Sequence, residues 1–67
     1  MDFQEFIRRL EILKWGVVAF NTYRLNGENH CYIMVGEKGN TGKFHKRECK
    51  ASELNQNLDS VFEMLKR

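Results

Sequence analysis

The chain has 67 residues, of which 42% are hydrophobic and 30% are charged, and its formal net charge is +2. This composition is typical of a soluble globular domain and excludes a disordered chain, while the length allows burial of only about 60% of the unfolded surface. No apolar run approaches the roughly 20 residues that span a bilayer, and the first residues lack the basic start of a signal peptide. We therefore expect one domain, residues 1–67, in the cytoplasm and without a membrane partner.

The first predicted element is a helix over residues 2–15, because apolar residues recur at spacings of three and four. Asp2 can act as N-cap, with Glu5 completing a capping box. Gly16 follows where a left-handed residue ends many helices, and Trp15 is expected to pack against the edge of a sheet. The apolar stripe of this helix consists of Phe3, Phe6, Ile7, Leu10 and Leu13.

A β-hairpin is predicted next, since two apolar runs, 17–25 and 29–35, flank Asn26-Gly27. Both turn residues tolerate the positive φ of a type I′ turn, which makes this dipeptide the strongest short-range hairpin signal. Counting back from a two-residue turn places Leu25 opposite Glu28 and fixes the register of both strands.

This register sorts the strand residues into two faces, because side chains alternate along a strand. The face expected to lie under the helices is mostly aliphatic and carries Val18, Phe20, Thr22, Cys31, Ile33 and Val35. The opposite face is mixed and carries Val17, Ala19, Asn21, Tyr23, His30, Tyr32 and Met34.

The rest of the chain predicts a turn at 37–42, a short charged edge strand at 43–48 and a last helix from Ser52, its N-cap. The stripe of this helix is Leu54, Leu58, Val61, Phe62 and Leu65. The predicted fold is therefore α+β, with two layers in the order α-β-β-β-α. Both helices pack on one face of a three-stranded antiparallel meander.

Residues 36–43, GEKGNTGK, invite comparison with a phosphate-binding loop. That motif needs four residues between Gly and Gly-Lys, followed by Ser or Thr. Here five residues intervene, and Phe44 stands where the hydroxyl is required. We interpret the segment as a hairpin turn.

Metal and catalytic chemistry are not expected from the two cysteines and two histidines. Adjacent His30 and Cys31 point to opposite faces of a strand, so at most three of the four side chains could converge on a zinc ion, and Cys31 is not placed beside His30 as a nucleophile beside its base. Two cysteines are also too few for a disulfide scaffold. We expect free thiols, Cys31 in a strand and Cys49 near the start of the last helix, and a non-enzymatic protein without a metal or cofactor.

The basic character is concentrated in residues 36–50, which hold five of the eleven cations and two of the nine anions. Basic side chains neutralise phosphates, and aromatic side chains on a sheet can stack on bases. Nucleic acid is therefore one candidate partner, with Lys43, His45, Lys46, Arg47 and Lys50 as the contacting residues.

The α-β-β-β-α order, the Gly-Glu-Asn-His segment at 27–30 and the Lys-Arg-Glu-Cys-Lys segment at 46–50 resemble the double-stranded-RNA-binding domain. That family has a G-P-x-H turn and a K-K-x-A-K helix start. This chain lacks the proline of that turn, and its capping signal comes after the lysine motif, so the resemblance is one of topology. It implies phosphate contacts by Lys46, Arg47 and Lys50 and a minor-groove contact by His30.

Protein binding is the primary hypothesis. A small domain with apolar residues on both faces of a sheet often completes its burial against a partner or a second copy of itself. Tyr and Met are enriched at such interfaces. We expect an inhibitor, adaptor or subunit, of the kind that phages and mobile elements encode, which binds through Tyr23, His30, Tyr32 and Met34.

Overall fold

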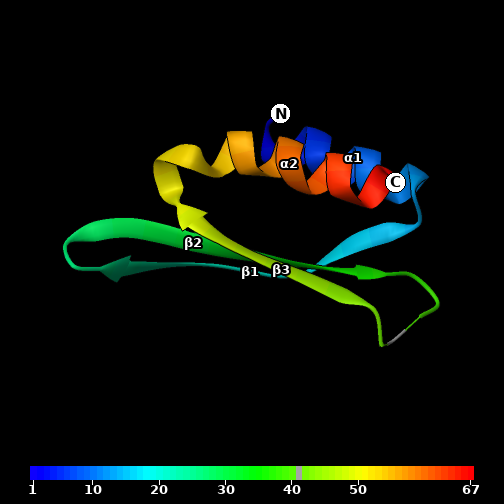
Figure 1. Ribbon diagram of the computed structural model, residues 1–67, viewed down its shortest axis with the longest axis horizontal. Coiled ribbons are helices and arrows are strands. Elements are labelled where there is room, and N and C mark those ends of the chain that lie inside the picture. Colours follow the sequence, from blue (N-terminus) through cyan, green and yellow to red (C-terminus); the bar gives the residue numbers. More distant parts are fainter. Residues whose placement is uncertain (41) are drawn as a thin grey trace.

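The computed structural model describes residues 1–40 and 42–67, and it confirms the α+β class and the two-layer arrangement (Figure 1). The three strands form one antiparallel sheet in the order β1-β2-β3. Both helices lie on the same face of this sheet, and no element of the described residues covers its other face. The elements are α1 (Phe3–Ile12), β1 (Trp15–Leu25), β2 (Glu28–Glu37), β3 (Phe44–Lys50), the 3-10 turn η1 (Ala51–Glu53) and α2 (Leu54–Lys66).

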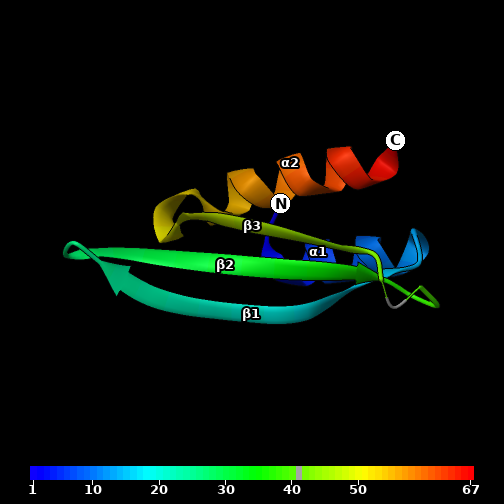
Figure 2. The ribbon, with the colours of Figure 1, turned by 60° about the horizontal axis from the view of Figure 1, so that its bottom comes forward.

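The core lies between the helices and the sheet. Helix α1 packs on β1 and on α2, and α2 packs on β3, beside which it runs in Figure 2. Both helices and strands β1 and β2 contribute large side chains that are almost fully buried, so the hydrophobic effect holds the two layers together. The buried core consists of Phe6, Leu10, Trp15, Ile33, Val35, Leu58 and Val61.

Helix α1 begins as predicted but ends earlier. The Asp2 carboxylate accepts a hydrogen bond from the Glu5 backbone N–H at 2.8 Å, which confirms the N-cap. The helix ends at Ile12, and the left-handed residue is Lys14 (φ 67°), so the predictions of a helix to residue 15 and of a capping Gly16 are wrong. This early turn lets Trp15 begin β1 and enter the core.

The hairpin turn is the predicted one, since Asn26 and Gly27 both have positive φ, 53° and 81°. The register also matches the prediction from the turn back to Ala19, which pairs with Met34. A bulge between Val17 and Ala19 then shifts the pairing by one residue.

The bulge reverses the predicted facing of two valines, because one extra residue in a strand changes which side chains point inward. Val17 pairs with Val35 and packs against the core. Val18 leaves 56% of its surface exposed. The prediction had put Val18 under the helices and Val17 on the opposite face, and it was wrong at both positions.

Strand β3 runs two residues further than predicted, to Lys50. Cys49 is consequently a strand residue that pairs with Cys31, and its predicted place near the start of the last helix is wrong. Hydrogen bonding to β2 overrode the weak strand character of this charged segment, because strand propensity depends strongly on tertiary context.

Helix α2 begins at Leu54, preceded by the 3-10 turn η1. Ser52 lies inside that turn, so the predicted N-cap role is wrong, and the residue that takes this place, Glu53, makes no side-chain capping hydrogen bond. The predicted apolar stripe of the helix is confirmed, with Leu58 and Val61 buried and Leu54, Phe62 and Leu65 packed against the core.

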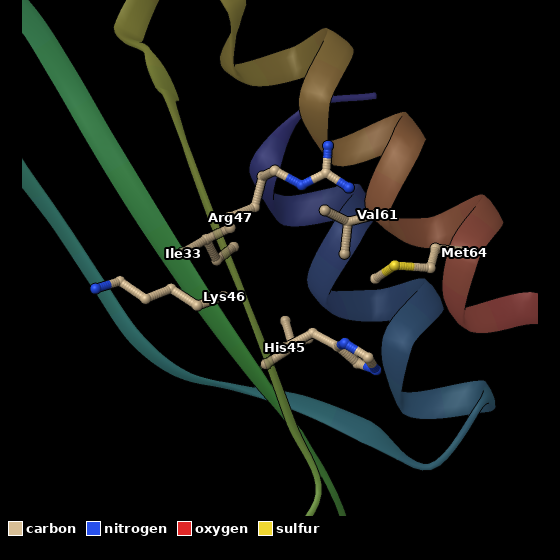
Figure 3. Close-up of a pocket in the computed structure, with 7 residues that line it drawn as sticks. Ile33, His45, Lys46, Arg47, Val61 and Met64 are labelled. Atoms are coloured by element: carbon tan, nitrogen blue, oxygen red, sulfur yellow. The ribbon is translucent and has the colours of Figure 1, made fainter.

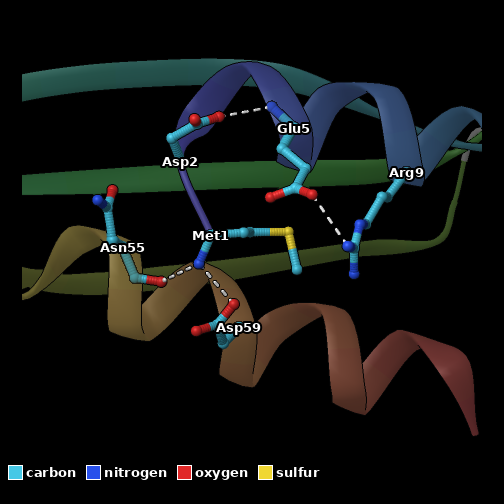
Figure 4. A network of polar contacts seen from close by, with 6 residues as sticks. All are labelled: Met1, Asp2, Glu5, Arg9, Asn55 and Asp59. Carbon is cyan, nitrogen blue, oxygen red and sulfur yellow. Dashed lines mark hydrogen bonds and ion pairs between the residues drawn. The ribbon is translucent and has the colours of Figure 1, made fainter.

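Polar contacts join the start of α1 to α2 (Figure 4). The Met1 amino nitrogen lies 2.6 Å from the Asp59 carboxylate and 3.4 Å from the Asn55 carbonyl oxygen. Within α1, Arg9 forms an ion pair with Glu5 at 2.9 Å. Exposed pairs of this kind contribute about 1 kcal/mol or less, so they orient the helices while the core supplies the stability.

Neither helix in the described part of the chain is long and apolar enough to cross a membrane.

Candidate binding surface

The face of the sheet turned away from the helices, here called the open face, carries a row of large apolar side chains. Along β2 these side chains alternate with the buried Cys31, Ile33 and Val35, which face the helices. The bulged Val18 joins the open face, and so does the ring of Phe44 from β3. The apolar side chains of the open face belong to Val18, Tyr23, Leu25, Tyr32, Met34 and Phe44.

One end of the open face is built over two glycines paired across β1 and β2, Gly16 and Gly36. A Cβ atom on Gly36 would lie 3.3 Å from two ring carbons of Phe44 and 3.5 Å from Val18 Cγ1. The Phe44 ring therefore rests directly on the backbone of Gly36, a close approach that the missing side chain allows. Phe44 and Val18 each expose more than half of their surface, 51% and 56%.

The middle of the open face is aromatic. The rings of Tyr23 and His30 stack with their centroids 5.7 Å apart and their planes inclined by 18°. The Lys46 ammonium lies over the Tyr32 ring, 4.7 Å from its centroid, in a cation–π contact. The four residues predicted as a protein-binding site, Tyr23, His30, Tyr32 and Met34, thus share one continuous surface.

The charges along this surface are paired. Lys46 lies 3.4 Å from Glu48, and Lys50 lies 3.4 Å from Glu28, which is also 3.8 Å from His30 Nε2. Just before β3, Lys43 lies 3.4 Å from Glu37, but its ammonium is over the ring of the core residue Trp15, 5.8 Å from the centroid, so it belongs to the helix side of the sheet. Lys46 and Lys50 thus each have a carboxylate neighbour, so these two cations add little net positive potential to the open face.

The other two basic residues of β3 point to the helices. His45 and Arg47 line a small cavity of about 80 Å³ together with Val61 and Met64 of α2, while Lys46 points away from it (Figure 3). The His45 ring lies 5.5 Å from the Trp15 ring. Ligand pockets are commonly about 300–1,000 Å³, so this cavity is too small for a cofactor-sized molecule.

The predicted nucleic-acid contacts are thus divided between two surfaces. Lys46 and Lys50 belong to the open face, whereas His45 and Arg47 lie toward α2. The roles implied by the double-stranded-RNA-binding domain also need the lysine motif at the start of a helix, but here it lies in β3. The order of elements agrees with that family, and the placement of Lys46, Arg47 and Lys50 does not.

The two cysteines meet on the helix-covered face, with their Sγ atoms 3.7 Å apart. Burial, followed by the hydrogen bond with Cys31, raises the pKa of the Cys49 thiol from 9.0 to about 11. Since the thiolate is the reactive form, such a thiol is a poor nucleophile near neutral pH. Among the described residues, no three His, Cys, Asp or Glu side chains form a group that could hold a metal ion.

No protein-family model matches this chain, and neither a curated protein nor a solved structure does.

Sequence reasoning missed Val18 and Phe44 as parts of the open face. Val18 could not be found, because a bulge leaves no clear mark in a run of apolar residues. Phe44 did carry a signal, since it alternates with Lys46, Glu48 and Lys50 along one face of β3. The missing information was the register of β3 on β2, which fixes the face to which that set belongs.

Proposed function

We propose that this domain is a non-enzymatic binding protein, an adaptor, inhibitor or subunit, that docks a protein partner on the open face. The observation that carries the proposal is the row of exposed apolar and aromatic side chains on the face that the helices leave bare. Contiguous exposed apolar patches on proteins of this kind mark interaction sites.

The composition of the open face supports a protein partner. Tyr, Met and Phe are enriched at protein interfaces, and lysine is depleted from their centres. The lysines of this face stand along β3 with carboxylates beside them, at the margin of the apolar row. This arrangement resembles an interface with an apolar centre and a polar rim.

Nucleic-acid binding is less well supported, because its affinity comes mainly from cations that neutralise phosphates. The basic residues of β3 face two directions, and the lysines of the open face would have to give up their carboxylate partners. A protein partner that docks on the apolar row can bind while these lysines keep their carboxylate partners.

The test is capture of partners from a lysate of the source cells, with bound proteins quantified by mass spectrometry. We expect Tyr32→Ala with Met34→Ala to lose at least about 90% of the captured partner, while nuclease treatment changes nothing. Truncating a central anchor at an interface commonly costs 2 kcal/mol or more, which is about thirtyfold in affinity.

The matched control is Ile12→Ala, at a site on α1 that is 77% exposed and lies on the opposite side of the molecule. This variant should retain full capture. Capture that survives the open-face substitutions, or that disappears on nuclease treatment, would contradict the proposal.

A further inference from the structure

The pairing of Cys31 and Cys49 has a chemical consequence that does not depend on the proposed function. The two residues lie directly opposite each other in the register of β2 and β3, and both are free thiols. Their Sγ atoms are 3.7 Å apart, and Cys31 is almost fully buried while Cys49 is half-buried.

The pairing of the two residues in the sheet is compatible with a disulfide bond. Residues directly opposite in an antiparallel pair have Cα atoms about 4.5–5.5 Å apart, within the 4.4–6.8 Å range of disulfides. The sulfur atoms would have to approach from 3.7 Å to about 2.05 Å. Rotation of the two side chains can supply this movement without displacing either strand.

We propose that Cys31 and Cys49 are an oxidative modification site, at which a low-molecular-weight disulfide such as glutathione disulfide converts the thiol pair into a disulfide that fastens β3 to β2. In the first step the Cys49 thiolate attacks one sulfur of glutathione disulfide and releases one glutathione thiolate. In the second step Cys31, deprotonated, attacks Cys49 Sγ and releases the second. The two protein thiols lose two electrons and two protons, and glutathione disulfide gains them.

Cys49 is the residue that reacts first, because Cys31 is enclosed by the core. The raised pKa of Cys49, about 11, keeps the thiolate scarce at neutral pH, so the reaction is slow there and accelerates as the pH rises. The thiol pair therefore persists in a reducing compartment and closes under sustained oxidation.

The bond would stabilise the attachment of an edge strand to the centre of the sheet. Strand β3 is an edge strand, and the chain passes from it through η1 into α2. Closing the loop between the two cysteines restricts the unfolded chain, an effect that raises Tm by roughly 10 °C in a domain of this size.

The experiment uses the unmodified domain, equilibrated at pH 8.5 with mixtures of reduced and oxidised glutathione. One series is in native buffer and the other in denaturant, and intact-mass spectrometry measures the species after acid quenching. We expect the equilibrium constant for the intramolecular disulfide to be at least about tenfold larger in native buffer, because only the folded chain holds the two sulfurs together. We also expect the oxidised form to melt at higher temperature.

An equal or smaller constant in native buffer would overturn the proposal, as would a native product consisting of mixed disulfides or of disulfide-linked dimers. Cys31→Ser and Cys49→Ser provide matched controls, since each retains one thiol and cannot form the intramolecular disulfide. The comparison of native buffer with denaturant needs no substitution, so it stays decisive even if a variant folds poorly.

Discussion

The two faces of the sheet are made from the same three strands, yet they differ in what covers them. One face carries Ile33 and Val35 beneath two helices and leaves 3% or less of either side chain exposed. The other carries Tyr32, Met34 and Phe44 and has no covering element in the described part of the chain. Apolar residues on the covered face are explained by folding, whereas those on the open face call for a different explanation, which we take to be a partner.

The largest expected effect comes from the covered face. Leu58→Ala removes a fully buried side chain from the middle of the core and should lower the free energy of unfolding by about 2–5 kcal/mol. At roughly 0.05–0.15 kcal/mol per residue, a domain of this size is stable by about 3–10 kcal/mol, so this loss will be obvious in urea titrations. A change below about 1 kcal/mol would contradict the assignment of Leu58 to the core.

Two neighbouring valines offer a sharper comparison, since the bulge sends one to each face. Val17→Ser should cost about 1–3 kcal/mol, because it places a hydroxyl against the core. Val18→Ser should change stability by about 0.5 kcal/mol or less, because Val18 is exposed. Urea unfolding of the two variants measures both values, and the reverse order would mean that β1 has the regular register without the bulge.

A pH dependence is also expected at Cys49, on the covered face. Its folded pKa of about 11 lies above the usual thiol pKa of 9.0, so the folded state holds the proton more tightly than the unfolded state. The contribution of this proton to the free energy of unfolding is present in full below about pH 9 and is lost as the pH rises toward 11. Urea midpoints between pH 8 and pH 10.5 should therefore fall more steeply for the unmodified domain than for Cys49→Ser. Parallel curves would exclude this contribution.

Much of the fold could be predicted from sequence, because local signals and tertiary structure agree there. The Asn26-Gly27 turn fixed the register as far back as Ala19, and the apolar stripe of α2 was correct in full. The end of α1 was mispredicted, because the helical pattern continued to Trp15 and gave no sign that the tryptophan was needed in the core.

The open face was predicted in part, and for a physical reason. Tyr23, His30, Tyr32 and Met34 all lie between the turn and the bulge, where alternation can be counted from the turn. Val18 and Phe44 lie beyond features that the sequence does not mark, a bulge and the pairing of β3 with β2. Cys49 was misplaced for the same reason, since only that pairing brings it to Cys31.

The measurement that tests the central claim most directly is site-specific photocrosslinking in the source cells. A photoreactive phenylalanine analogue is placed at Tyr32 or Phe44 on the open face or, as a control, at Ile12 on α1. We predict that irradiation attaches a partner protein at the two open-face positions and not at Ile12, with the adducts identified by mass spectrometry. Adducts that form equally at Ile12, or none at Tyr32 and Phe44, would contradict the claim that the open face is the binding surface.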